Sequence, residues 1–219
     1  MTDQIADQMR ACSANEVFHI ARKACIGSGL TPDRAEDLAE AATLLQCSGY
    51  AGLSALHRLL VRHGRAEHTP QLQLSLSAGQ IQADLLRPEA EGVAVIDWLI
   101  SHPETGQADC AVLCDDIMFA GLLLAAVRAY GGWFTLHLSG SSDPVHIVNT
   151  SIVAELPASA GWRLYYHAGP PSAEALVYHH TDVAFAIWTA LGKLAHLTYV
   201  PASEASRQSG AGAGLVDND

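Results

Sequence analysis

Residues 109–138, DCAVLCDDIMFAGLLLAAVRAYGGWFTLHL, constrain the fold of this chain more than any other stretch. They open with a short unbroken apolar run, which is typical of a strand buried on both faces. A longer apolar run of helical length follows, and a second strand-like run comes after two glycines. The stretch therefore predicts a buried strand–helix–strand crossover within a sheet.

The N-terminal part of the chain carries helix signals. Ser13 and Glu16 have the spacing of a capping box, in which each side chain satisfies a backbone amide of the other residue. Thr31 followed by Pro32 opens a second helix, and Gly64 ends a third. Residues 13–64 are therefore predicted to form a compact three-helix unit.

Strand signals dominate the chain after this unit. LQLSLS alternates strictly and is followed by a turn and QIQADLL, which predicts a hairpin. VHIVNTSIVAEL, WRLYYHAG and LVYHH predict an antiparallel meander. TDVAFAIWTALGKLAHL is apolar nearly all round, which predicts a long buried C-terminal helix.

These elements together predict an α+β fold. We expect the N-terminal three-helix unit to pack on a mixed, mostly antiparallel sheet that contains the buried crossover. The length favours one domain over residues 1–219. Its parts are the helical unit at 13–64, a sheet-containing core at 70–200 and a Gly-rich C-terminal segment at 201–219.

Composition limits the partners. The net charge is −11 and the Lys and Arg residues form no basic stripe, so we expect no nucleic acid. The apolar runs are shorter than the roughly 20 residues that span a bilayer, so we expect no membrane partner.

An odd number of cysteines and the lack of a signal peptide favour the cytoplasm. Only 16% of residues are charged, which predicts an apolar homo-oligomer interface.

Both ends of the chain resemble a known family. NEVFHIARKACIGSGL and AEDLAEAATLLQCSGYAGLSALHRLL near the start, and LAHLTYVPASEASRQSGAGAGLVDND at the end, resemble a family of bacterial proteins catalogued as a domain of unknown function. The resemblance implies a cytoplasmic bacterial protein of about this length. It implies no particular activity.

The spacing of the first stretch is also similar to the helical N-terminus of the malate/L-lactate dehydrogenases that lack a Rossmann fold. Those enzymes place a catalytic histidine in a short loop where this sequence has SGYAGLSA, residues 48–55. No histidine stands there, and the chain is shorter than those enzymes. That dehydrogenase activity is therefore not expected.

The C-terminal SEASRQSGAGAGLVDND is the main candidate site. Gly210, Gly212 and Gly214 alternate with alanine, and glycine lets successive backbone N–H groups converge on an anion. Arg207 can hold a carboxylate through two parallel hydrogen bonds. Glu204 is the candidate catalytic group, because its carboxylate can move a proton. A frayed tail is the alternative explanation of this composition.

Two more residues complete the candidate site. Lys23, one of two lysines in the chain, lies on the predicted first helix and is a candidate anion contact for a tail folded against that helix. A solvated polar helix face is the alternative. Ser203 is a candidate ligand-binding residue, with helix capping as its alternative role.

Histidines on the predicted sheet suggest a second site. Pairing Leu138 with Val145 places His137 directly opposite His146 on one face. Two neutral imidazoles there can bind a metal or exchange protons near neutral pH, and a polar sheet surface is the alternative. The same register places His167 on the other face.

Two pairs beside the buried strand receive plainer interpretations. Cys110 and Cys114 are interpreted as small core residues rather than metal ligands. Asp115 and Asp116 are interpreted as caps of the following helix, with a magnesium or general-base role as the alternative. The candidate site therefore includes no metal ligand.

The predicted function is that of a cytoplasmic enzyme or enzyme subunit acting on a small carboxylate-bearing metabolite. Its site would be formed by the C-terminal Gly-rich segment and the first helix. The alternative is a non-catalytic oligomeric accessory or scaffold protein whose tail packs into a neighbouring subunit. No motif of a defined reaction is present, so the sequence leaves the cofactor and the reaction type unknown.

Overall fold

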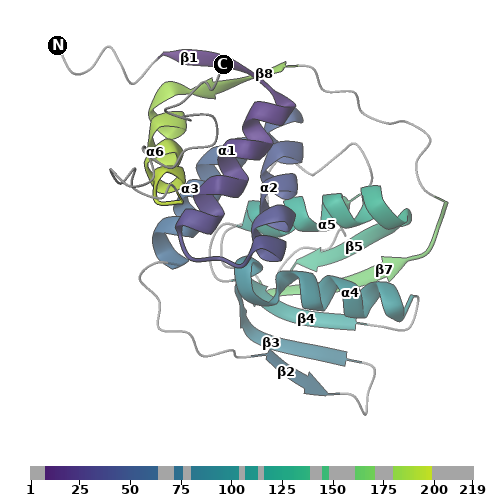
Figure 1. Ribbon diagram of the computed structural model, residues 1–219. Coiled ribbons are helices and arrows are strands. Elements are labelled where there is room, and N and C mark those ends of the chain that lie inside the picture. Colours follow the sequence, from purple (N-terminus) through teal and green to yellow (C-terminus); the bar gives the residue numbers. More distant parts are fainter. Residues whose placement is uncertain are drawn as a thin grey trace, which may run out of the picture.

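The computed structural model describes residues 8–63, 72–75, 80–103, 107–112, 116–138, 145–147, 161–170 and 180–198 (Figure 1). The helices in these ranges are α1 (Ala14–Gly27), α2 (Pro32–Cys47), α3 (Gly52–His63), α4 (Val93–Ser101), α5 (Asp116–Tyr130) and α6 (Phe185–His196), with a π-helical turn η2 (Pro88–Gly92). The strands are β1 (Met9–Ser13), β2 (Leu72–Ser75), β3 (Gln80–Leu86), β4 (Gln107–Val112), β5 (Trp133–Leu138), β6 (Val145–Ile147), β7 (Gly161–His167) and β8 (His180–Ala184).

The first three helices form the predicted N-terminal unit. The capping box at its start is confirmed, because the Glu16 N–H donates to Ser13 Oγ at 3.2 Å and the Ser13 N–H donates to Glu16 Oε2 at 2.9 Å. α1 packs one stripe of small apolar side chains against the neighbouring elements. Val17, Ala21 and Cys25 belong to this stripe and are fully buried. Local signals thus place this unit correctly.

The larger sheet has the strand order β2-β3-β4-β7-β5-β6. β3 and β4 pair in parallel and the other neighbours pair antiparallel, so the sheet is mixed and mostly antiparallel, as predicted. The crossover from β4 through α5 to β5 is also confirmed. β7 inserts between its two strands, however, so β6 and β7 are not the neighbours that the predicted meander requires.

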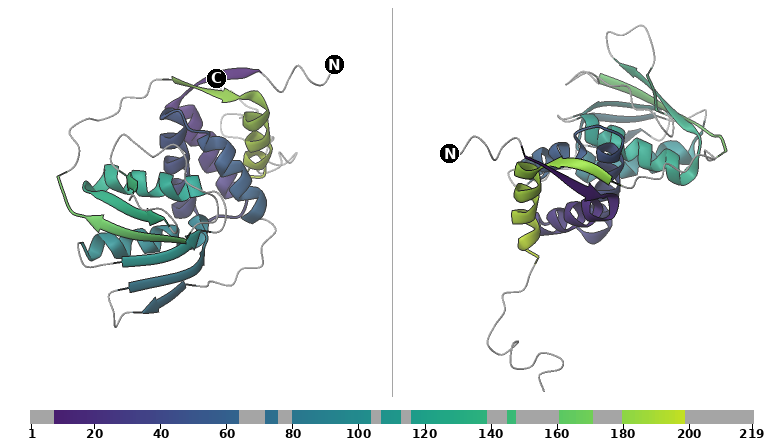
Figure 2. Two further views of the ribbon diagram at one scale, coloured as in Figure 1. Left: turned by 180° about the vertical axis from the view of Figure 1, so that it is seen from behind. Right: turned by 90° about the horizontal axis from the view of Figure 1, so that it is seen from above.

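The helices α4 and α5 lie on the same side of this sheet (Figure 2). The strand side chains beneath them are buried, among them Phe134, Leu164 and Tyr166. α5 is the predicted buried helix, and it separates the sheet from the N-terminal unit. α2 and α3 pack on α5, so the unit rests on the sheet mainly through this helix.

The C-terminal helix departs from the prediction. α6 packs beside α1 at the edge of the molecule, and only Leu191 and Ala195 of its residues are buried (Figure 1). The prediction of a long buried helix is wrong, because an apolar helix needs neighbours on every side to be buried and α6 contacts α1 and α3 on one side. The residues before Phe185 form β8, which pairs with the unpredicted β1 in a two-stranded sheet.

Within the described ranges, none of the helices combines the length and the apolar content that crossing a bilayer requires.

Candidate functional site

Most of the predicted site lies outside the described residues, which end at Thr198. These positions stay predictions: Ser203, Glu204, Arg207, Gly210, Gly212 and Gly214. Lys23 is described, and it lies exposed on α1 one helical turn before Gly27. The backbones of α1 and α6 approach each other closely at Gly27, since a Cβ added there would lie 2.0 Å from the Leu194 carbonyl oxygen of α6. The C-terminal end of α6, which precedes the predicted tail in the sequence, therefore lies against α1.

The residues beside the buried strand are only partly described. Asp116 begins α5, whereas Asp115 and Cys114 lie outside the described ranges. Cys110 lies on β4. The capping and core roles predicted for these side chains therefore stay predictions.

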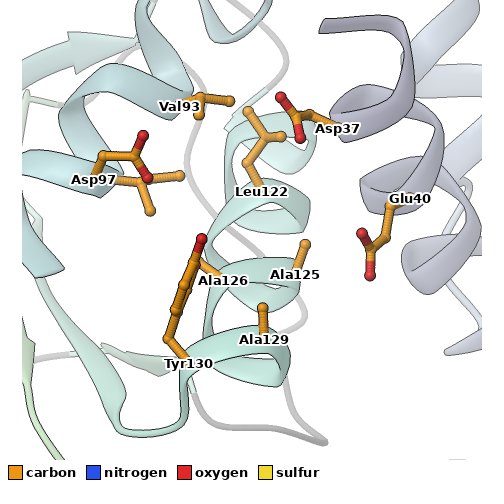
Figure 3. A pocket seen from close by; sticks show the side chains of 10 residues that line it. Asp37, Glu40, Val93, Asp97, Leu122, Ala125, Ala126, Ala129 and Tyr130 are labelled. Carbon is orange, nitrogen blue, oxygen red and sulfur yellow. The ribbon is translucent and has the colours of Figure 1, made fainter. Parts of the chain in front are cut away.

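A pocket of about 200 Å³ lies between α2, α4 and α5 (Figure 3). Its floor is apolar and is formed mainly by Leu122 and three alanines of α5. Asp37 and Glu40 of α2 and Asp97 of α4 supply carboxylates to its lining. Sequence analysis missed this pocket because its acids come from separate helices, although the three-residue spacing of Asp37 and Glu40 places both on one helix face.

The electrostatics of this pocket disfavour an anion. Partial burial raises the pKa of Asp37 above its ordinary value, and the carboxylates of Asp33 and Asp97 raise that pKa further. Carboxylates that already repel one another would repel a carboxylate ligand as well. The pocket is therefore a poor site for the predicted class of metabolite.

The raised pKa of Asp37 makes stability depend on pH. A carboxyl group whose pKa is higher in the folded state contributes stability below its unfolded pKa and loses that contribution as pH rises through the folded pKa. Asp37→Asn should therefore raise the free energy of unfolding at pH 7, by about 0.5 kcal/mol since Asp33 is a like charge at i,i+4. Urea unfolding at pH 7 and at about pH 3, where the carboxyl is protonated, tests this. A gain of the same size at both pH values would contradict it.

A second group of functional side chains lies on the face of the sheet opposite α4 and α5. Thr135 Oγ1 of β5 lies 3.3 Å from His146 Nδ1 of β6 and 3.0 Å from His167 Nε2 of β7. Thr135 is buried, while His146 is exposed and His167 is half-buried. Three adjacent strands thus join two imidazoles through one hydroxyl group.

This geometry corrects the predicted register. Leu136, rather than Leu138, pairs with Val145, so His146 lies opposite Thr135 and not opposite His137. A shift of two residues keeps every side chain on its face, so His137 and His146 still share a face. His167 lies on this face too, contrary to the prediction, because β7 buries the alternate residues Leu164 and Tyr166 against the helices.

The shared hydroxyl couples the two imidazoles. A hydroxyl group has one proton, so Thr135 can donate to one ring nitrogen while it accepts a hydrogen bond from the other. Two neutral rings cannot both point a lone pair at Thr135, because its hydroxyl group has only one proton to donate. With one N–H and one lone pair pointing at it, the hydroxyl group accepts from one ring and donates to the other, which suits a path along which a proton moves.

Other donors and aromatic rings surround this pair. The His167 ring stacks on Trp133 at 5.1 Å between centroids, and His137 meets Tyr165 edge to face at 5.7 Å. The Tyr165 hydroxyl donates to Gln107 Oε1 at 3.0 Å. Arg163 is exposed on the same face and pairs with His137 in the β5–β7 register. We call Trp133, Thr135, His137, His146, Arg163, Tyr165 and His167 the histidine face.

In the part of the chain that the structure describes, no group of three or more His, Cys, Asp or Glu side chains is placed to hold a metal ion. The hypothesis of metal binding by His137 and His146 therefore gains no third ligand from these residues.

The turn η2 holds buried charges that sequence analysis did not single out. The Arg87 N–H donates to Glu91 Oε2 at 2.9 Å, and its guanidinium lies 3.4 Å from Glu91 Oε1. Glu89 Oε1 lies 3.9 Å from His63 Nδ1 of α3, with both side chains buried, and burial raises the pKa of Glu89. The Arg87–Glu91 ion pair holds the turn, and the contact between Glu89 and His63 joins α3 to the β3–α4 connection, so we assign these side chains to structure.

Comparisons with known proteins yield little. No protein-family model matches the chain, and no curated protein matches it. Among solved structures, malate dehydrogenase from Entamoeba histolytica is similar over 81% of this chain, with a TM-score of 0.46 and 11% sequence identity. The chain spans half the length of that protein, since 50% of it is covered. A likeness of this size carries no inference about fold or activity, and the resemblances seen in the sequence stay predictions.

Proposed function

We propose that this protein is an enzyme that acts on a small carboxylate-bearing metabolite bound at the histidine face, where His146 and His167 exchange a proton with it. The observation that carries the proposal is the hydrogen-bonded chain His146–Thr135–His167. Imidazole is the side chain that most often serves as general acid and base near neutral pH. A pair linked through a hydroxyl group can take a proton at one ring and release one at the other.

The ligand class follows from the donors on this face. Imidazole N–H groups and the Arg163 guanidinium donate hydrogen bonds, and a carboxylate only accepts them. Trp133, 38% exposed and stacked on His167, adds a flat apolar surface for the body of a small molecule. The pocket between α2, α4 and α5 is lined by carboxylates, which repel a carboxylate ligand. The histidine face is therefore the better fit for this ligand class.

This location differs from the one that the sequence predicts. Lys23 lies on α1, in the N-terminal unit on the far side of α5, whereas the histidine face lies on the far side of the sheet (Figures 1 and 2). Lys23 and the His146–His167 pair therefore belong to separate surfaces. A tail site around Arg207 remains the competing location for the same class of ligand.

Solution NMR tests the location. Small mono-, di- and hydroxycarboxylates are added to the full chain while the imidazole Cε1–H signals are followed. We expect saturable shifts at His146 and His167 and none at His19, an exposed histidine of α1 that serves as the control. If Arg207→Ala abolishes binding while His146→Gln and His167→Gln leave it unchanged, the tail is the site and this location is wrong.

Catalysis is tested once a bound carboxylate has been found. Replacing a general acid or base typically lowers turnover by about 10²–10⁴-fold, and we expect that loss for His167→Gln. Thr135→Val keeps the side-chain shape but removes the hydroxyl, so it should reduce turnover while the ligand still binds. Unchanged turnover in both variants would contradict the proposed proton path.

A further inference from the structure

A groove of about 490 Å³ runs between α3 and α6, away from both surfaces discussed above. His57 of α3 lines one side of it. The other side is one face of α6, from Phe185 to Leu194, and it includes Lys193. The groove thus combines apolar surface with basic groups.

The apolar surface around the groove is unusually exposed. Phe185 is 40% exposed, and Leu197, at the end of α6, is 70% exposed. Met9, 60% exposed, pairs with Ala184, the residue before Phe185, and Val61 lies one helical turn beyond His57. Folded proteins seldom leave several large apolar side chains open to water along and beside one groove, so this apolar strip is expected to be covered.

Charge indicates what covers it. Neither α3 (GLSALHRLLVRH) nor α6 (FAIWTALGKLAH) contains an Asp or Glu, although the whole chain has a net charge of −11. The two helices contribute Arg58, Arg62 and Lys193, in addition to histidines. An occupant with apolar side chains next to acidic ones complements such a surface.

We propose that this chain's own C-terminal segment, residues 199–219, docks in the α3–α6 groove. The segment follows directly on α6, whose face from Phe185 to Leu194 spans about 15 Å at 1.5 Å per residue. An extended chain covers that distance in roughly five residues, so the segment is long enough to turn back along the helix. Its Leu215 and Val216 match the apolar strip, and Asp217 and Asp219 match Lys193 and His57.

Solution NMR and hydrogen exchange test this docking. In the full-length protein we expect nuclear Overhauser effects between the Leu215 and Val216 methyl groups and the Phe185 ring. Hydrogen exchange of the α6 amides should be about tenfold faster in the double variant Leu215→Ser, Val216→Ser, which loses its apolar anchors. It should be about threefold faster in Lys193→Glu, as expected for one exposed ion pair.

Arg34→Glu is the matched control, because it makes the same charge reversal at an exposed position of α2, which does not line the groove, and should leave the exchange of α6 unchanged. Combining Lys193→Glu with Asp217→Lys should restore slow exchange. Absence of the Overhauser effects together with unchanged exchange in the serine variant would overturn the proposal. A dimer by light scattering that dissociates in the serine variant would also overturn it, in favour of docking in a neighbouring subunit.

Discussion

Replacing Phe119 with alanine should lower the free energy of unfolding by about 3–5 kcal/mol, the largest loss that we expect from a single side chain. Phe119 is fully buried on α5, the helix that separates the sheet from the N-terminal unit. A cavity at this position would remove packing contacts between α5 and the elements around it. The surrounding side chains and backbone cannot easily move in to fill it. A Cβ on Gly92 would already lie 3.5 Å from the Phe119 ring, so the backbone of η2 is close by.

Urea unfolding followed by circular dichroism measures this loss. Domains of this size are stable by about 5–15 kcal/mol, so Phe119→Ala should move the midpoint strongly or leave the chain partly unfolded. Phe119→Leu, which keeps most of the volume, should cost clearly less. Tyr130→Ala is the control on the same helix, because Tyr130 is 61% exposed. Equal losses for Phe119→Ala and Tyr130→Ala would show that α5 is not packed as described.

Gly27→Ala should destabilise the protein by about 1–3 kcal/mol by forcing α1 away from α6. The added Cβ would lie 2.0 Å from the Leu194 carbonyl oxygen and 2.9 Å from the Leu194 carbonyl carbon. Both are backbone atoms, so no side-chain rotation can relieve the overlap. The helices have to separate, and the α3–α6 groove has to change with them.

Gly192→Ala is the matched control for this prediction. Gly192 lies within α6, and a Cβ added there meets nothing within 4 Å. Alanine is favoured over glycine inside a helix, so this variant should gain about 0.5–1 kcal/mol. Thermal or urea unfolding of the two variants gives the comparison. If both substitutions stabilise the protein, the close approach of α1 and α6 is wrong.

The local sequence predicted the elements well and their neighbours less well. The capping box at Ser13, the hairpin of β2 and β3, and the buried helix α5 each depend on residues near one another in the chain, and all three are confirmed. The position of β7 between β4 and β5 depends on pairing between distant segments. Alternation within a strand shows which residues share a face but not which strand lies beside it.

The same distinction separates the two accounts of the site. The sequence singled out His137 and His146 as a pair, whereas the structure joins His146 to His167 through Thr135. These contacts cross three strands: the two-residue shift placed His146 opposite Thr135 on the predicted face, and the position of β7 brought His167 to that same face. The acids lining the pocket between α2, α4 and α5 come from separate helices, which local patterns do not bring together.

The sequence by itself determined the α+β class, the three-helix unit and the apolar helix at the centre, because helix capping and the period of apolar residues act over a few positions. Tertiary structure decided which strands are neighbours, which imidazoles share the Thr135 hydroxyl, and that α6 lies at the edge rather than in the core. Burial is a property of packing between elements. An apolar helix such as α6 is covered only where another part of the protein is placed to cover it.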